Sequence, residues 1–370
     1  MDQELARQEV AVAGKMLMES GLIVRTWGNV SCRIDSGCFA ITPSGMAYET
    51  MRPGDIVIVN TADQSYEGRI KPSSEKGIHA RLYQLLPHIN FVIHTHQVNA
   101  SVAAVLGEDV EILDPKNREI IGERAAIAGY GLPGTKKLQK NVAKAVSRFP
   151  ARALLMANHG ALCFGEDCGR AFAAARALED ECGRFLTPPP PPSPGKPAES
   201  RRAGQDMIFQ ESGGEIRVPL SSGSDGLPVE ARLHLAVYRA RRDVAFILGS
   251  SEPSTFRASR ECGALKPLLD DFAQIAGVSV AAADCDGEKG PDRLVRALRG
   301  RSAVLLKGRG ALCCAGSRED AAAVAMVLEK ECLAYFAAAA RGPVKPISPL
   351  ECRLMRFVYL SRYAKKARKE

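Results

Sequence analysis

The sequence has few histidines, few aromatic residues and no long apolar run. Of its 370 residues, six are histidine and one is tryptophan, and aromatic residues make up 6%. The longest apolar runs are far shorter than the roughly 20 residues that a membrane-spanning helix needs. The first residues, Met1-Asp2-Gln3-Glu4, are acidic and polar, unlike a secretory signal. These absences argue against a membrane protein and against a secreted one.

Closely spaced cysteine pairs of the CxxC type are also missing. The eleven cysteines are an odd number, and most lie in apolar or helical contexts such as Ala161-Leu162-Cys163. A disulfide framework is not expected in a chain of this length. We interpret the cysteines as reduced core thiols of a cytoplasmic protein.

The net charge of +8 comes almost entirely from the end of the chain. Residues 341–370 hold nine Lys and Arg against two Glu, a net charge of +7, so the rest of the chain is close to neutral. No basic patch with interleaved aromatic residues is found, which argues against nucleic-acid binding. We interpret 341–370 as a basic, solvated C-terminal tail; contact with an anionic surface is the alternative.

Length and an apolar content of 46% suit two ordinary domains with cores of their own. The first half mixes α and β patterns with short connections and no regular alternation of strand and helix. A proline-rich linker is predicted at 187–205. Its five consecutive prolines indicate a semi-rigid polyproline II spacer more strongly than a peptide ligand for another protein.

Helices are predicted over 5–20, 136–149 and 169–186, and strands over 39–41, 56–59 and 91–93.

The second half repeats the first, which indicates a tandem duplication. Three stretches match: Leu233–Tyr238 with Ile78–Tyr83, Val244–Leu248 with Ile89–Ile93, and Leu305–Cys313 with Leu155–Cys163. The predicted domains are therefore 1–186, then a partial and degenerate second copy over 206–340.

His94-Thr95-His96 is the most informative motif. It follows an apolar run that predicts a buried strand, and residues i and i+2 of a strand project from the same face. His159 follows a second apolar run, within Asn158-His159-Gly160. Three imidazoles and the nearby carboxylate Glu75 are suited to a metal-assisted site.

Each of these motifs also has an ordinary structural interpretation. Two histidines on one strand are often a hydrogen-bonded pair, and Asn-His-Gly is typical of turns. Glu75 follows Ser73-Ser74 and precedes a helical pattern, so it is suited to capping a helix. The combination in this order is more specific than any of its parts.

The first half resembles the class II aldolase/adducin family over roughly residues 4–186. The family's motifs occur in order, and the Ser-Ser-Glu version most resembles the sugar-phosphate aldolases that cleave fuculose or rhamnulose phosphates. The matching residues are Thr26–Ser31, Ile41–Gly45 with Tyr48, Pro72–Glu75 with His79 and Tyr83, His94–His96, and Asn158–Gly160.

This resemblance implies a fold, a cofactor and a reaction. The implied fold is a three-layer α/β/α arrangement around a mixed, mostly antiparallel sheet. The implied activity is reversible cleavage of a small ketose 1-phosphate to dihydroxyacetone phosphate and an aldehyde, by a homo-oligomer with one Zn²⁺ per chain. In the implied site, His94, His96 and His159 bind the metal and Glu75 is the acid/base; Gly28, Asn29, Ser44, Gly45, Ser73 and Ser74 bind the phosphate, with backbone N–H groups around Gly28-Asn29 and Ser44-Gly45 as donors.

Two departures limit the resemblance. The tyrosine that donates a proton in the aldolases is missing from its expected stretch, Glu108–Pro115, and Tyr359 and Tyr363 are only loose candidates for a second one. Epimerisation, dehydration and decarboxylation of sugar phosphates, and a non-catalytic adducin-like role, therefore stay open. The second copy has Gly249, Ser251 and Arg309 where the first has its histidines. It also lacks counterparts of Gly28-Asn29 and Ser44-Gly45, because only a short segment separates the linker from the repeated region. We therefore predict a structural role for the second copy.

Overall fold

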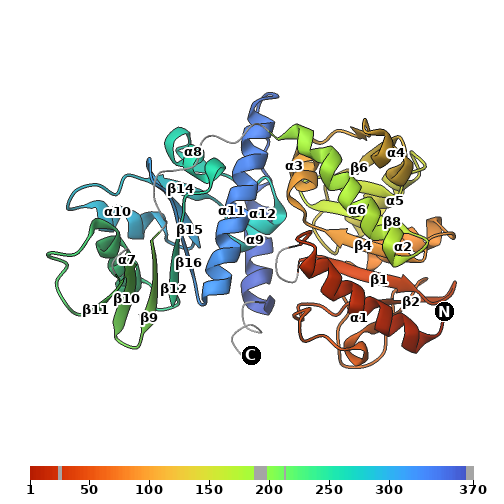
Figure 1. The fold of residues 1–370 in the computed structure, drawn as a ribbon, viewed down its shortest axis with the longest axis horizontal. Helices are drawn as coiled ribbons and strands as arrows, with labels where there is room; N and C mark the ends of the chain where they lie inside the picture. The colour runs from red at the N-terminus through yellow and green to blue at the C-terminus, as the bar shows by residue number, and fades with distance from the viewer. Residues whose placement is uncertain (24–26, 187–197, 212–213, 364–370) are drawn as a thin grey trace. The chain divides into compact units, whose positions relative to one another are not determined.

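The computed structural model describes residues 1–23, 27–186, 198–211 and 214–363 (Figure 1). The chain forms two compact units, which divide between Leu186 and Thr187. Thr26, most of the predicted linker and the last seven residues of the predicted basic tail lie outside the described residues. Each unit is described by itself.

The first unit contains one eight-stranded sheet in the order β3-β2-β1-β4-β8-β7-β6-β5. All neighbouring strands are antiparallel except β6 and β7, which are parallel. The strands are β1 (Asn29–Arg33), β2 (Cys38–Ile41), β3 (Val57–Asn60), β4 (Phe91–Thr95), β5 (Val110–Glu111), β6 (Arg124–Ala128), β7 (Ala153–Met156) and β8 (Gly160–Gly165). The helices are α1 (Gln3–Glu19), η1 (Pro53–Asp55), α2 (Lys76–Leu85), α3 (Val98–Leu106), α4 (Pro115–Ile121), α5 (Lys136–Val146), α6 (Cys168–Cys182) and η2 (Gly183–Phe185).

Helices cover both faces of this sheet, because both faces of its central strands are apolar. Phe91 and Ile93 of β4 pack in a core with α1, α3 and α6, whereas Val92 packs on the opposite face with α2 and α5. The predicted three-layer fold with a mixed, mostly antiparallel sheet is confirmed. His94 continues the alternation on the face of Val92, which is the face covered by α2.

The second unit repeats this sheet in the same order, β11-β10-β9-β12-β16-β15-β14-β13. The predicted duplication is confirmed, and the second copy is more complete than expected. Its strands are β9 (Glu199–Ala203), β10 (Asp206–Glu211), β11 (Gly214–Pro219), β12 (Phe246–Ser250), β13 (Ala264–Leu265), β14 (Val280–Ala283), β15 (Ala303–Leu306) and β16 (Gly310–Ala315). Its helices are α7 (Val229–Ala240), α8 (Pro253–Glu261), α9 (Asp270–Ile275), α10 (Gly290–Ala297), α11 (Arg318–Ala339), α12 (Pro349–Val358) and η3 (Tyr359–Tyr363).

Two segments differ from their sequence-based assignment. Residues 199–203, assigned to the linker, form β9, which pairs with both β10 and β12. Residues 349–358, assigned to the basic tail, form α12, which packs on α9. Cys352 and Met355 of α12 are buried, and Arg356 donates hydrogen bonds to the carbonyl oxygen of Gln274 and the hydroxyl of Ser302, at 2.9 and 2.8 Å. The strand was not predicted because it directly follows the proline-rich segment and was counted with it. The helix was not predicted because the high net charge of the tail outweighed its few apolar positions.

The connection that differs most between the copies follows the second strand of each sheet. In the first unit a long segment leads from Ile41 at the end of β2 to Val57 at the start of β3. In the second unit only residues 212–213 separate β10 from β11. The segment that carries Ser44 and Gly45 therefore has no equivalent, as the sequence predicts. The strand that carries Asn29 does have one, β9, contrary to expectation.

All eleven cysteines are free thiols, and nine of them are buried, as expected for core residues. Burial raises the pKa of the Cys168 thiol to about 11 and that of Cys285 to about 11. Among the described helices, none has both the length and the apolarity that a bilayer span requires.

Candidate metal centre

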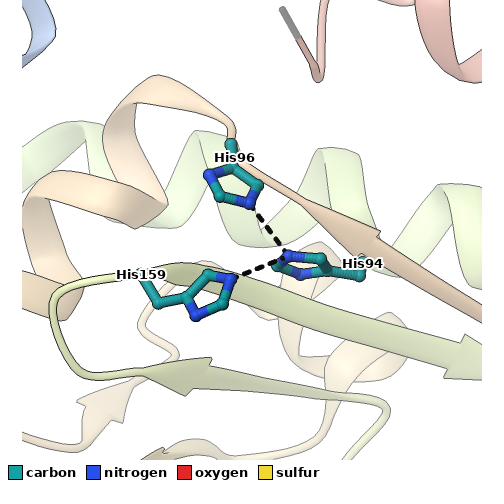
Figure 2. Close-up of side chains that lie close together, drawn as sticks. All are labelled: His94, His96 and His159. Atoms are coloured by element: carbon teal, nitrogen blue, oxygen red, sulfur yellow. Dashed lines mark hydrogen bonds between the residues drawn. The ribbon is translucent and has the colours of Figure 1, made fainter. Parts of the chain in front are cut away.

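Three histidine side chains from two separate segments converge in the first unit (Figure 2). His94 and His96 lie at and just beyond the end of β4, and their two Nε2 atoms are 2.9 Å apart. The Nε2 atom of His159 is 3.1 Å from that of His94. All three side chains are buried, with exposed fractions of 0%, 7% and 1%. The structure thus brings together the three predicted metal ligands.

A tight hairpin between β7 and β8 delivers His159. The loop is Ala157-Asn158-His159, closed by a hydrogen bond from the N–H of His159 to the carbonyl oxygen of Met156 at 3.0 Å. Asn158 adopts a left-handed conformation with φ of +61°, which asparagine tolerates better than most residues. At Gly160 a Cβ atom would lie 2.2 Å from the carbonyl oxygen of Thr95. Asn-His-Gly is therefore a turn that also places the predicted ligand His159 beside His94.

The geometry suits a tetrahedrally coordinated metal ion. Zn–N bonds of about 2.0–2.1 Å place neighbouring ligand atoms about 3.4 Å apart in a tetrahedron, close to the separations found here. The Nδ1 atom of His94 lies 2.9 Å from the carbonyl oxygen of Ala161, so this nitrogen carries the proton and donates it there. The Nε2 lone pair of His94 is consequently directed at the centre, as expected for a ligand oriented by a backbone carbonyl.

Glu75 completes the cluster as a fourth group. Its two carboxylate oxygens lie 3.2 Å from the Nε2 atoms of His94 and His159. Glu75 occupies the N-cap position of α2, but its side chain accepts no capping hydrogen bond, so helix capping does not account for it. Burial raises the pKa of Glu75, whereas positive charge on the three adjacent imidazoles and a hydrogen bond from Asn29 lower it and prevail, to about 2. A carboxylate at this place therefore interacts favourably with positive charge at the centre.

The predicted phosphate-binding residues come from three segments that lie beside one another. Ser44 donates its backbone N–H to the carbonyl oxygen of Lys71 at 2.9 Å, and Ser73 donates its own to Thr42 at 3.0 Å. Gly28 adjoins β4, where a Cβ atom would meet the carbonyl oxygen of His94 at 2.7 Å. The Ser44 amide is thus engaged within the protein, and phosphate binding by Ser44 stays a prediction through its hydroxyl. Gly45, with φ of +67°, and the exposed Ser74 stay as candidates.

The sequence motifs include Ser31 and His79, but no role was predicted for either residue. The Ser31 hydroxyl lies 2.7 Å from the His79 Nδ1 atom and 2.7 Å from the Tyr83 hydroxyl. Burial lowers the pKa of His79 to about 3, with the nearby His94 also contributing, so the imidazole is neutral. The repeat held a signal for this group, because His234 and Tyr238 keep the spacing of His79 and Tyr83.

The equivalent place in the second unit has no metal-binding set among its described residues. Arg309 occupies the hairpin position of His159, and Gly249 and Ser251 replace His94 and His96. The Arg309 guanidinium pairs with Asp286 and lies 3.9 Å from Glu230, which stands opposite Glu75 in the repeat. A fixed positive charge thus faces the carboxylate that remains there.

The sequence matches the family described as "Class II Aldolase and Adducin N-terminal domain" twice, over residues 8–186 and 201–336. The chain belongs to this family. The two matched segments fall in the two structural units, and the second begins within β9. Membership was predicted from the motifs of the first half and is confirmed for both halves.

The relatives of this class II aldolase-family chain include enzymes of different activities. It is 34% identical over 177 residues to a 5-deoxy-D-ribulose 1-phosphate aldolase from Bacillus thuringiensis serovar kurstaki. The aligned segment covers 47% of this chain and 80% of that protein. The chain is 31% identical over 186 residues to an L-ribulose-5-phosphate 4-epimerase from Salmonella paratyphi B, covering 47% and 81%. A solved L-fuculose 1-phosphate aldolase is 33% identical, with a TM-score of 0.46 over 49% of this chain and 84% of that one.

Proposed function

We propose that the first unit is a zinc-dependent aldolase that reversibly cleaves a small ketose 1-phosphate to dihydroxyacetone phosphate and an aldehyde. One observation carries this proposal: the Nε2 atoms of His94 and His159 both lie 3.2 Å from carboxylate oxygens of Glu75, beside His96. The relative named as a 5-deoxy-D-ribulose 1-phosphate aldolase supports the substrate class.

The residues present suit zinc. Three neutral imidazoles are a frequent ligand set for a catalytic zinc site that keeps a position open for substrate. Bound there, the ion supplies a Lewis acid for the carbonyl and hydroxyl oxygens of a ketose. His94, His96 and His159 would hold it, with the backbone carbonyl of Ala161 orienting His94.

Glu75 would move the proton on carbon. In condensation, the Glu75 carboxylate would take a proton from the dihydroxyacetone phosphate carbon that forms the new bond. In cleavage the carbon–carbon bond breaks, its electron pair stays with that carbon, the substrate hydroxyl releases one proton, and Glu75, once protonated, would return one proton to the carbon. Glu75 is buried beside the histidines, within the centre where the substrate would react. Ser73, Ser74, Gly45 and the segment around Gly28 would bind the phosphate, through hydroxyl and backbone N–H groups.

A second candidate keeps the site and changes the outcome to epimerisation of a ketopentose phosphate. The observation favouring it is that residues 108–115 contain no tyrosine and instead form β5 and the start of α4. The group that removes the hydroxyl proton in cleavage is therefore not identified. The relative named as an L-ribulose-5-phosphate 4-epimerase supports this candidate. Tyr359 lies at the end of α12 in the second unit. Dehydration or decarboxylation of a sugar phosphate would use the same site and stays open as an alternative reaction.

The deciding experiment combines metal analysis with a substrate screen. The zinc-loaded chain is incubated with a panel of ketose 1-phosphates, and dihydroxyacetone phosphate is measured by enzymatic coupling. L-ribulose 5-phosphate is tested in parallel for conversion to its 4-epimer. Dihydroxyacetone phosphate formation that disappears in Glu75→Gln supports the aldolase. Epimer formation alone overturns it in favour of the second candidate, and inactivity of a zinc-loaded chain on the whole panel contradicts both.

We further propose that the second unit supports the first without chemistry of its own, and that the chain forms a homo-oligomer. Its sheet keeps a buried core that includes Ile247, Val304 and Leu312, whereas the metal-ligand positions are lost. Sedimentation of the full chain tests the assembly, and a monomer at micromolar concentration would contradict it.

A further inference from the structure

A buried line of hydrogen bonds leads from the fold's interior to Glu75. The Asn29 side-chain nitrogen donates to a Glu75 carboxylate oxygen at 3.0 Å. The Asn29 side-chain oxygen contacts the Nε2 atom of His79, and the His79 Nδ1 atom lies 2.7 Å from the Ser31 hydroxyl. These four side chains are almost completely buried, with exposed fractions of 4%, 7%, 0% and 0% for Asn29, Glu75, His79 and Ser31.

The direction of each hydrogen bond follows from the chemistry of its ends. An amide nitrogen donates and an amide oxygen accepts, so Asn29 presents its NH₂ group to Glu75 and its oxygen to His79. His79 must then carry its proton on Nε2, and its Nδ1 atom accepts from the Ser31 hydroxyl. That hydroxyl oxygen in turn accepts from Tyr83, whose hydroxyl is 2.7 Å away. One consistent set of donors and acceptors accounts for each hydrogen bond from Tyr83 to Glu75.

The second unit keeps the serine, histidine and tyrosine of this line but not the asparagine. There the Ser200 hydroxyl lies 2.7 Å from the His234 Nδ1 atom and 3.0 Å from the Tyr238 hydroxyl, the same arrangement as in the first unit. Ser200 pairs with Ile247 as Ser31 pairs with Val92, so the residue at the position of Asn29 is Ala198. The His234 Nε2 atom has no hydrogen-bond partner among the described residues.

We infer that His79 is a positioning residue that orients Glu75 through Asn29. The serine, histidine and tyrosine hold the helix to the sheet in both units. The extension through asparagine exists only in the unit that has Glu75 and the three metal ligands. Asn29 holds one Glu75 oxygen, while the other faces His159 at 3.2 Å. Asn29 is thereby assigned to the acid/base, in addition to the phosphate role expected from the sequence. This inference deepens the proposed function and rests on it.

The first test needs no substrate. Long-range ¹H–¹⁵N correlation spectra of the full chain report which ring nitrogen of each histidine carries the proton. We expect His79 to be the Nε2–H tautomer, with an Nε2–H resonance that Asn29→Ala shifts and Ser31→Ala does not remove. An Nδ1–H tautomer for His79, or an Nε2–H resonance indifferent to Asn29→Ala, overturns the inference. Either result leaves the proposed reaction standing.

The second test separates positioning from folding, with a matched control in the same chain. His79→Met removes the donor at similar volume, His79→Gln restores an N–H near the Nε2 position, and His234→Met makes the same change in the second unit. We expect His79→Met to lower kcat on the order of tenfold, with KM and zinc content nearly unchanged, and His79→Gln to recover most of it. His234→Met should lower thermal stability comparably and keep kcat.

A double-mutant cycle decides whether His79 acts through Asn29. In an Asn29→Ala background, His79→Met should cost no further kcat. An equal cost in both backgrounds, or an equal loss of kcat in His234→Met, overturns the inference. If wild-type activity is found and Glu75→Gln leaves it intact, the failure lies in the proposed role of Glu75, which the tautomer test keeps distinguishable.

Discussion

His159 and Arg309 occupy the same position in two hairpins of the same form. Each donates its backbone N–H to the residue three positions earlier, Met156 at 3.0 Å and Leu306 at 2.9 Å. Each follows a residue with left-handed backbone, Asn158 or Gly308, at φ of +61° and +71°. The second unit has therefore kept the hairpin and replaced the predicted metal ligand, so it supplies internal controls for the first.

The first prediction concerns metal content. The purified chain should hold about one zinc ion, because one of its two copies has the three histidines. His94→Ala should lose the metal, and His234→Ala, a buried histidine outside the centre, should keep it. Elemental analysis after gel filtration measures both. Two ions per chain, or none after zinc supplementation, would contradict the prediction.

The second prediction concerns Glu75→Gln. The variant should retain its zinc, since three imidazoles remain, and should lose turnover by a factor on the order of 10² or more, as for a missing acid/base. Elemental analysis and steady-state kinetics on the substrate found in the screen measure the two effects. Glu230→Gln, at the matching position of the second unit, should change neither. Wild-type turnover in Glu75→Gln would show that the assigned role is wrong.

The third prediction concerns the closing glycine of each hairpin. In Gly160→Ala the new Cβ atom would lie 2.2 Å from the Thr95 carbonyl oxygen and 3.4 Å from the His94 ring. We expect about 1–3 kcal/mol of destabilisation, as for other overpacked sites, together with weaker zinc binding. Gly310→Ala meets the Ser250 carbonyl oxygen at 2.1 Å and adds strain at φ of +95°. It should destabilise the chain without changing zinc affinity, as measured by competition with a chelating dye.

The fourth prediction concerns acid sensitivity. Burial lowers the pKa of His79 and of His234 to about 3. Between about 3 and 6.5 the unfolded chain binds protons at these sites that the folded chain does not, so stability falls as pH falls. Each histidine contributes a slope of up to about 1.4 kcal/mol per pH unit. His234→Met should flatten the dependence of the unfolding free energy on pH between 6 and 5, in urea titrations followed by circular dichroism. An unchanged slope would show that His234 is protonated in the fold.

The fifth prediction concerns Arg309. Its ion pairs with Asp286 and Glu230 are exposed, so Arg309→Ala should cost less than about 1 kcal/mol and leave turnover unchanged. Arg309→His should not add a second zinc ion, because Gly249 and Ser251 offer no imidazole. Loss of turnover in Arg309→Ala would show that the second unit takes part in the reaction.

Sequence was sufficient for the fold and for the residues of the centre, because their signals are local. The i, i+2 spacing of His94 and His96 needs only a strand, and Asn158-His159-Gly160 needs only a turn. The line from Ser31 to Glu75 could not be predicted in this way, since its members meet only when β1 pairs with β4 and α2 packs on them. The same holds for the Ser44 amide, which is engaged by Lys71 from a distant segment.

The place of β4 in the sheet has a practical consequence. Its neighbours are β1, which carries Asn29, and β8, which leads back to His159. A slip of β4 by one residue would turn Thr95 toward the centre and both histidines away from it, because strand side chains alternate between faces. Zinc binding at the proposed site would therefore report the registration of three strands at once. A zinc-responsive dye can follow the refolding of the first unit and distinguish a correctly paired sheet from a collapsed one with similar secondary structure.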